Sequence, residues 1–139
     1  MKKVVGYTTG VFDLFHIGHL NILEQAKKHC DYLIVGVTTD EEAYRLKNVK
    51  PFIPFEERYR IVKSIKYVDE VVPEKHSDKL LAWSRLGFNV IFKGSDWQGT
   101  ELWNRYGLFF SNQGVKVHFI DYTKGTSSTE LRKFIKNYR

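Results

Sequence analysis

The sequence predicts an α/β fold built on a five-stranded parallel sheet with helices on both faces. Strand-like and helix-like segments alternate along the 139 residues, an order typical of parallel strands joined by crossover helices. The segment YLIVGVT at residues 32–38 is almost continuously apolar, as expected of a strand buried on both faces. No linker, internal repeat or low-complexity stretch interrupts the alternation, so we expect one domain over residues 1–139.

The individual elements follow from short apolar runs for strands and from apolar residues at helical spacing for helices. Leu20, Leu23 and Ala26 show this spacing after the first strand, and Pro54 suits the first turn of a later helix. The charged segment 40–51 is expected to be a mobile loop over the site. Strands are predicted at 3–8, at 32–38, within 67–72, at 90–92 and at 115–120, and helices at 20–30, from 54 onward, at 78–86, at 101–110 and at 128–138.

Charge and composition indicate which kinds of ligand and which location in the cell to expect. The formal net charge is +6 and the pI is about 9.4, so the surface attracts anions, either nucleic acid or phosphorylated small molecules. The basic residues are spread along the chain without a block of five, which disfavours a nucleic-acid arm. No apolar run approaches the roughly 20 residues that span a bilayer, and Cys30 is the single cysteine. We therefore expect a cytoplasmic protein without membrane insertion.

The loop after the first predicted strand carries the main functional signal. His16 and His19 share one face if both lie in the first turn of the next helix, and Gly18 between them leaves room for a ligand. Such a pair can bind a metal or donate hydrogen bonds to phosphate oxygens. Phosphate is favoured, because the turn presents backbone N–H groups and, apart from Asp13, no further metal ligand stands nearby. The predicted nucleotide contacts here are Thr9, Gly10, Val11, Phe12, Asp13, His16 and His19.

Residues 10–19 resemble the (G)xFDxxHxGH signature of the cytidylyltransferase family, and the resemblance is strongest to its bacterial glycerol-3-phosphate cytidylyltransferases. It extends over nearly the whole chain. It implies a Rossmann-like fold, magnesium carried mainly by the nucleotide triphosphate, and a homodimer. Further matches in the same order are TTD at 38–40, ER at 57–58, YVDEV at 67–71, GSDW at 94–97 and TKGTSST at 123–129.

The resemblance also assigns roles to residues in the later loops. Lys47, with Lys50 as the alternative, is placed against phosphate as a catalytic and acceptor-binding lysine, and Arg58 is implied to face the acceptor phosphate. Lys66 stands where the glycerol-3-phosphate enzymes carry an arginine and is the third predicted acceptor contact. The predicted base and ribose contacts are Gly94, Asp96 and Trp97, and the predicted triphosphate contacts are Thr123, Thr126, Ser127, Ser128 and Thr129.

Together these features predict a nucleotidyltransferase that moves CMP from CTP to a small phosphorylated alcohol, with glycerol 3-phosphate as the preferred acceptor. Two arginines expected from the family are replaced, by Lys66 and Tyr122, and Thr126 replaces an isoleucine of the motif. The two lost arginines leave phosphoethanolamine, phosphocholine or a sugar phosphate open as acceptors. ATP stays open as donor, because only the resemblance of residues 94–97 favours cytidine. An RNA-binding module on the same HIGH-type fold is the alternative without catalysis. The sequence lacks a P-loop and a GxGxxG fingerprint, which excludes the corresponding kinases and dehydrogenases.

Overall fold

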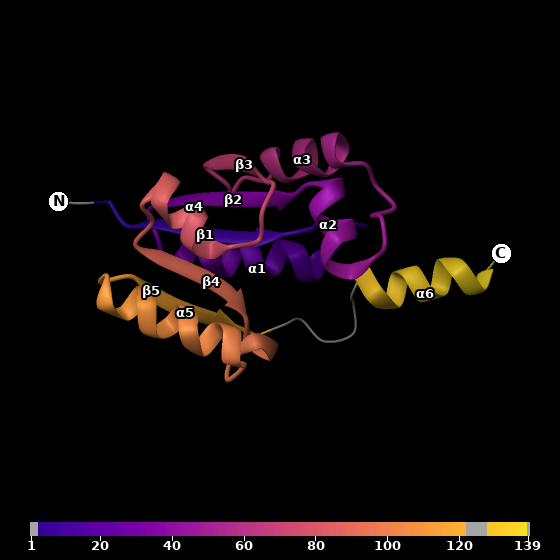
Figure 1. The fold of residues 1–139 in the computed structure, drawn as a ribbon. Helices are drawn as coiled ribbons and strands as arrows, with labels where there is room; N and C mark the ends of the chain where they lie inside the picture. The colour runs from indigo at the N-terminus through magenta and orange to yellow at the C-terminus, as the bar shows by residue number, and fades with distance from the viewer. Residues whose placement is uncertain (1–2, 122–127, 139) are drawn as a thin grey trace.

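The computed structural model describes residues 3–121 and 128–138, and for residues 128, 129 and 138 the backbone alone. It confirms the α/β fold with a five-stranded parallel sheet (Figure 1). The strands are β1 Val5–Gly10, β2 Tyr32–Thr38, β3 Glu70–Glu74, β4 Val90–Gly94 and β5 Lys116–Ile120. The helices are α1 Ile17–Lys28, α2 Asp40–Lys47, α3 Phe55–Lys63, α4 Lys79–Leu86, α5 Glu101–Asn112 and α6 Ser128–Tyr138, with a 3-10 turn η1 at Ser95–Trp97.

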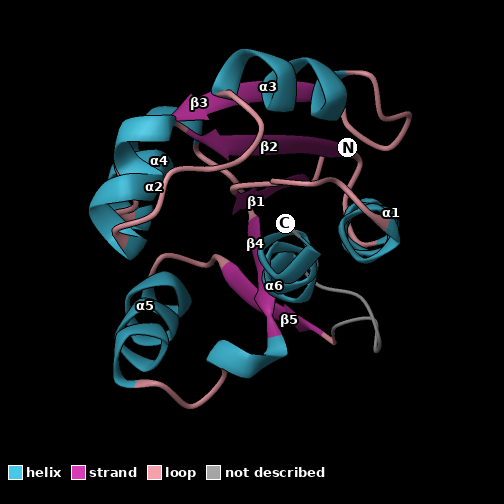
Figure 2. Ribbon diagram, turned by 90° about the vertical axis from the view of Figure 1, so that its right-hand side faces the viewer, coloured by secondary structure: helices cyan, strands magenta, loops and turns pink. Residues whose placement is uncertain are grey.

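Two apolar clusters cover the two faces of the sheet. Leu23 of α1 and Val62 of α3 join one cluster, and Trp103 and Phe110 of α5 join the other together with partly buried residues of α4. Figure 2 shows α1 on one side of the strands and α4 and α5 on the other. In the described residues no helix is long and apolar enough to cross a membrane.

The strand order is β3-β2-β1-β4-β5, so the direction of winding reverses between β1 and β4. In open parallel sheets, ligands bind beyond the carboxyl ends of the strands at this reversal. β1 pairs with β2 over all six of its residues, but with β4 only at Gly6↔Val90 and Tyr7↔Ile91. Beyond Tyr7 the two strands separate, and the Thr8 hydroxyl donates across the gap to the Phe92 carbonyl at 3.3 Å. The sheet therefore opens where the sequence places the site.

One predicted loop is wrong. Residues 40–51 were expected to be a mobile loop, yet residues 40–47 form helix α2. The Thr39 hydroxyl caps this helix by accepting from the Glu42 N–H, and Asn48 ends it in a left-handed conformation. Three acidic residues occupy the first turn, where the helix dipole favours negative charge.

Candidate active site

The two histidines stand at the start of α1, as their spacing predicted. His16 is the N-cap residue, and its Nδ1 accepts from the Gly18 N–H at 3.0 Å. His19 Nδ1 accepts in turn from the His16 N–H at 3.2 Å, and the two rings stack with centroids 4.0 Å apart. A neutral imidazole that accepts at Nδ1 carries its proton on Nε2. The helix start therefore fixes the same tautomer in both rings, with both Nε2–H groups as donors.

The surroundings keep both rings neutral. Burial lowers the pKa of His16 below its ordinary value. Burial and the neighbouring His16 lower the pKa of His19 to about 4, although Asp13 opposes the shift. At neutral pH the pair therefore presents hydrogen-bond donors without charge. Positive potential at this position comes instead from the N-terminus of α1, where backbone N–H groups and the helix dipole favour an anion.

We expect nitrogen-15 NMR of the imidazole rings to show protonated Nε2 and bare Nδ1 for both histidines near pH 7. As the pH falls, His19 stays neutral until the pH approaches its pKa of about 4, because burial and the neighbouring His16 disfavour the charged ring. In the urea-unfolded chain the same ring should titrate near its ordinary value of about 6.5. A folded spectrum with Nδ1 protonated at neutral pH would contradict the tautomer.

The loop before the histidines is held in a strained shape. Phe12 and Leu14 adopt φ values of 55° and 51°, a left-handed conformation that costs on the order of 1–3 kcal/mol for such residues. The buried Phe12 ring packs beside Phe15 and His19, and the Asp13 carboxylate accepts from the backbone N–H groups of residues 52 and 53. Asp13 also forms an ion pair with Arg132 of α6. These contacts fix the loop that carries the two histidines.

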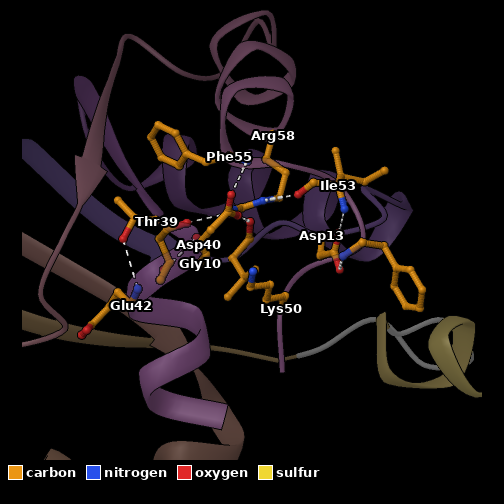
Figure 3. A network of polar contacts seen from close by, with 12 residues as sticks. Gly10, Asp13, Thr39, Asp40, Glu42, Lys50, Ile53, Phe55 and Arg58 are labelled. Atoms are coloured by element: carbon orange, nitrogen blue, oxygen red, sulfur yellow. Dashed lines mark hydrogen bonds and ion pairs between the residues drawn. The ribbon is translucent and has the colours of Figure 1, made fainter. Parts of the chain in front are cut away.

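Arg58 is buried at the centre of a polar network (Figure 3), with its side chain fully covered. Its guanidinium donates to three backbone carbonyls, those of Val11, Thr38 and Ile53, at 2.7–2.8 Å, and to Asp40 at 2.6 Å. The resemblance implied that Arg58 faces the acceptor phosphate. In this structure its donors instead join the loop after β1, the end of β2 and the start of α3, which makes it a positioning residue.

The predicted acceptor lysines are not brought together within one chain. Lys47 ends α2 and Lys50 follows it, both exposed at the carboxyl edge of the sheet. Lys66 precedes β3 and therefore lies at the opposite, amino edge, where its ammonium sits over the Tyr67 ring. The strand between the two edges spans more than about 13 Å. Within one chain Lys66 therefore lies away from Lys47, and its contact with the acceptor stays a prediction.

The turn after β4 places the predicted base-binding residues at the opening. Gly94 ends the strand, and Asp96 and Trp97 lie in the 3-10 turn, where Trp97 is 38% exposed. The sequence interpretation missed Lys93, Lys79 and Glu74 nearby. Lys79 is buried, and it donates to Glu74 at 2.8 Å and to the Thr9 hydroxyl at 3.0 Å. Thr9 thus binds a buried lysine on the α4 side of β1.

Other predicted contacts have no side-chain description. Thr123, Thr126 and Ser127 lie outside the described residues, and for Ser128 and Thr129 only the backbone is described, at the start of α6. Beside the site, between α1 and the end of β5, a hollow of about 490 Å³ is lined by Asn21, Gln25, His118, Phe119, Ile120 and Asp121. In the described residues no three His, Cys, Asp or Glu side chains form a group that could hold a metal ion.

Comparison with known proteins places this geometry among nucleotide-transferring enzymes. Residues 7–134 match the family model described as cytidylyltransferase-like. The chain is 37% identical to glycerol-3-phosphate cytidylyltransferase of Bacillus subtilis, covering 97% of this chain and 98% of that protein. It is 34% identical to the same enzyme of Staphylococcus aureus, covering 96% and 94%. The crystal structure of a lipopolysaccharide core biosynthesis protein from Thermoplasma volcanium superposes with a TM-score of 0.73 at 25% identity, covering 90% of this chain and 100% of that one.

Proposed function

The chain belongs to the cytidylyltransferase-like family and is a cytidylyltransferase, and we propose that it transfers CMP from CTP to glycerol 3-phosphate. The products are CDP-glycerol and pyrophosphate. One observation carries the assignment of the reacting centre. Two neutral imidazoles with fixed Nε2–H donors lie at the N-terminus of α1, beside the point where β1 and β4 separate.

The proposed reaction is an in-line displacement at the α-phosphorus of CTP. An oxygen of the acceptor phosphate forms the new bond, and the bond from phosphorus to the bridging oxygen of the β-phosphate breaks, so pyrophosphate leaves. A phosphate dianion is already a competent nucleophile near neutral pH, and no general base is needed. The protein positions the reactants and stabilises the charge that spreads over the transferring group.

His16 and His19 supply that stabilisation in the proposal. Their Nε2–H donors contact non-bridging oxygens of the α- or β-phosphate, and they bind most strongly as charge builds up in the transition state. The capping bonds at Nδ1 keep the two donors preorganised, so no rearrangement is needed during the reaction. Neutral rings suit this role because they cannot lose the donor proton to solvent near pH 7.

We further propose that Mg²⁺ enters with the triphosphate, because this ion retains water and commonly binds nucleotide phosphates rather than an all-protein cage. A homodimer in the cytoplasm is the assembly and location that the family resemblance implies. Size-exclusion chromatography with light scattering would return a mass near twice 16.4 kDa for the dimer and near 16.4 kDa for a monomer.

The substrates are tested by pyrophosphate release with CTP or ATP, each paired with glycerol 3-phosphate, phosphoethanolamine, phosphocholine or a heptose 1-phosphate. We expect glycerol 3-phosphate to be consumed fastest, and kcat/KM for CTP to exceed that for ATP by about tenfold or more, since a base pocket that hydrogen-bonds cytosine leaves polar groups unpaired with adenine. Glycerol without phosphate is the blank. If another acceptor reacts while glycerol 3-phosphate does not, the proposed acceptor is wrong, but the chain still transfers a nucleotide to a phosphorylated acceptor. An equal rate with ATP would overturn the choice of CTP.

A further inference from the structure

Lys93 is a lysine that the mechanism above does not use. It is the residue before Gly94 at the carboxyl end of β4, and its ammonium lies 4.7 Å from the centre of the Trp97 ring and 5.6 Å from that of Trp103. Among the described residues no carboxylate, hydroxyl or carbonyl is within hydrogen-bond distance of this ammonium, yet it is not sealed from solvent. The side chain is therefore a largely desolvated cation whose ammonium still reaches solvent.

The charges around Lys93 do not neutralise it. Lys47 of α2 and Lys79 of α4 add positive charge, and Glu74 of β3 and Asp96 of η1 add negative charge. Glu74 already forms a buried ion pair with Lys79, so its charge is largely balanced there. Burial and the positive charge of Lys79 lower the pKa of Lys93 to about 8. A desolvated cation without a hydrogen-bonded partner is costly, and a bound anion would offset that cost.

The position of Lys93 relative to the histidines indicates which anion it binds. Side chains alternate between the two faces of a strand, so Lys93 lies on the same face of β4 as Ile91. Ile91 belongs to the apolar cluster that α5 covers. Thr9 of β1 lies on this face of the sheet as well, because it binds Lys79 of α4. His16 and His19 belong to α1 on the other face. In an in-line displacement the attacking and leaving groups lie on opposite sides of the phosphorus. If α1 holds the triphosphate, the acceptor arrives from the side of Lys93.

We propose that Lys93 is the specificity-determining residue that binds the phosphate of the acceptor. This inference rests on the proposed function, because it takes glycerol 3-phosphate as the acceptor and the α1 side as the place of the leaving pyrophosphate. The ammonium lies over the Trp97 and Trp103 rings, and these cation–π contacts hold it in place before the acceptor arrives. Phosphate is thereby selected over a neutral alcohol, and Lys93 fills the role that the sequence interpretation gave to Lys66.

The test uses Lys93→Met, which removes the charge and keeps the length of the stem, and Lys93→Arg, which keeps the charge. The matched control is Lys116→Met, an exposed lysine at the first residue of the neighbouring strand β5. We expect Lys93→Met to raise KM for glycerol 3-phosphate by about tenfold to a hundredfold, as for loss of one charged hydrogen bond, with KM for CTP changed less than about twofold. Lys93→Arg should recover most of the loss, and Lys116→Met should match the wild type.

A binding measurement separates this inference from the reaction itself. Because the ammonium lies over two tryptophan rings, glycerol 3-phosphate or inorganic phosphate should change the tryptophan fluorescence of the wild type in a saturable way, and glycerol should not. In Lys93→Met the dissociation constant for either phosphate should rise by the same factor as KM. If the wild type binds phosphate through Lys93 but makes no CDP-glycerol, the proposed function is wrong, whereas the phosphate site at Lys93 is still supported.

Three results would overturn the inference about Lys93. The first is an unchanged dissociation constant and an unchanged KM for glycerol 3-phosphate in Lys93→Met. The second is a rise in KM for CTP without a rise for the acceptor, which would place the lysine against the nucleotide. The third is equal loss in Lys93→Met and Lys93→Arg with normal unfolding curves, which would mean that stem packing rather than charge matters.

Discussion

Replacing His16 or His19 by alanine lowers kcat by about a hundredfold or more while the affinity for CTP changes only a few-fold. The loss is of this size because each Nε2–H donor acts on charge that is present mainly in the transition state. The measurement is steady-state kinetics with CTP and glycerol 3-phosphate, together with CTP binding by calorimetry. Near-normal kcat in both variants would remove the histidines from the reacting centre.

His16 is both the N-cap of α1 and a proposed donor to phosphate, so a second substitution is needed to separate the two roles. His16→Ala also removes the acceptor for the Gly18 N–H, which costs about 1 kcal/mol of stability. His16→Asn retains an N-cap acceptor but lacks the imidazole donor, so it should unfold like the wild type and still lose activity. His29→Ala, at the other end of the same helix, is the control that should keep full kcat. Activity retained in His16→Asn would make capping the role of His16.

The sequence predicted where the two histidines lie, at the start of α1, because the signals for that position are local. Two histidines three residues apart, with glycine between them and a strand before them, must come together if a helix begins there. The same local logic was available for α2 and was missed. Thr39 and Glu42 have the spacing of a helix start, and the acidic residues between them favour a helix N-terminus. The charge of segment 40–51 alone predicts a loop, whereas its capping residues predict the helix that the structure contains.

Long-range geometry is what the sequence could not supply. Arg58 takes partners from three separate segments, and nothing near it in the chain shows that its donors are already occupied. Lys66 is a different case, because the strand predicted within 67–72 follows it, and that order already places it at the amino edge of a parallel sheet. Lys93 did leave a signal, since it is the charged residue of an otherwise apolar strand, VIFKG.

Replacing Arg58 by methionine destabilises the protein by about 3 kcal/mol or more, as expected when a buried charge is removed from its partners. Three backbone carbonyls lose their donor, and Asp40 loses its ion pair. The free energy of unfolding from urea titration measures the effect. Arg60→Met is the matched control, because Arg60 is exposed on the same helix and its loss should change stability by less than about 0.5 kcal/mol.

The same variants decide between the two roles of Arg58. A positioning residue acts by fixing the loop after β1 and the end of β2, so its loss should lower stability first and reduce kcat through misplacement of the histidine loop. A direct phosphate ligand would instead raise KM for the acceptor with little change in stability. Arg58→Lys is informative here, because lysine keeps the charge but cannot supply the guanidinium's separate N–H groups to three carbonyls and a carboxylate. If Arg58 is a positioning residue, Arg58→Lys should lose stability while its KM for glycerol 3-phosphate stays near that of the wild type. A stable Arg58→Lys variant with a raised KM would instead show that Arg58 binds the acceptor phosphate directly.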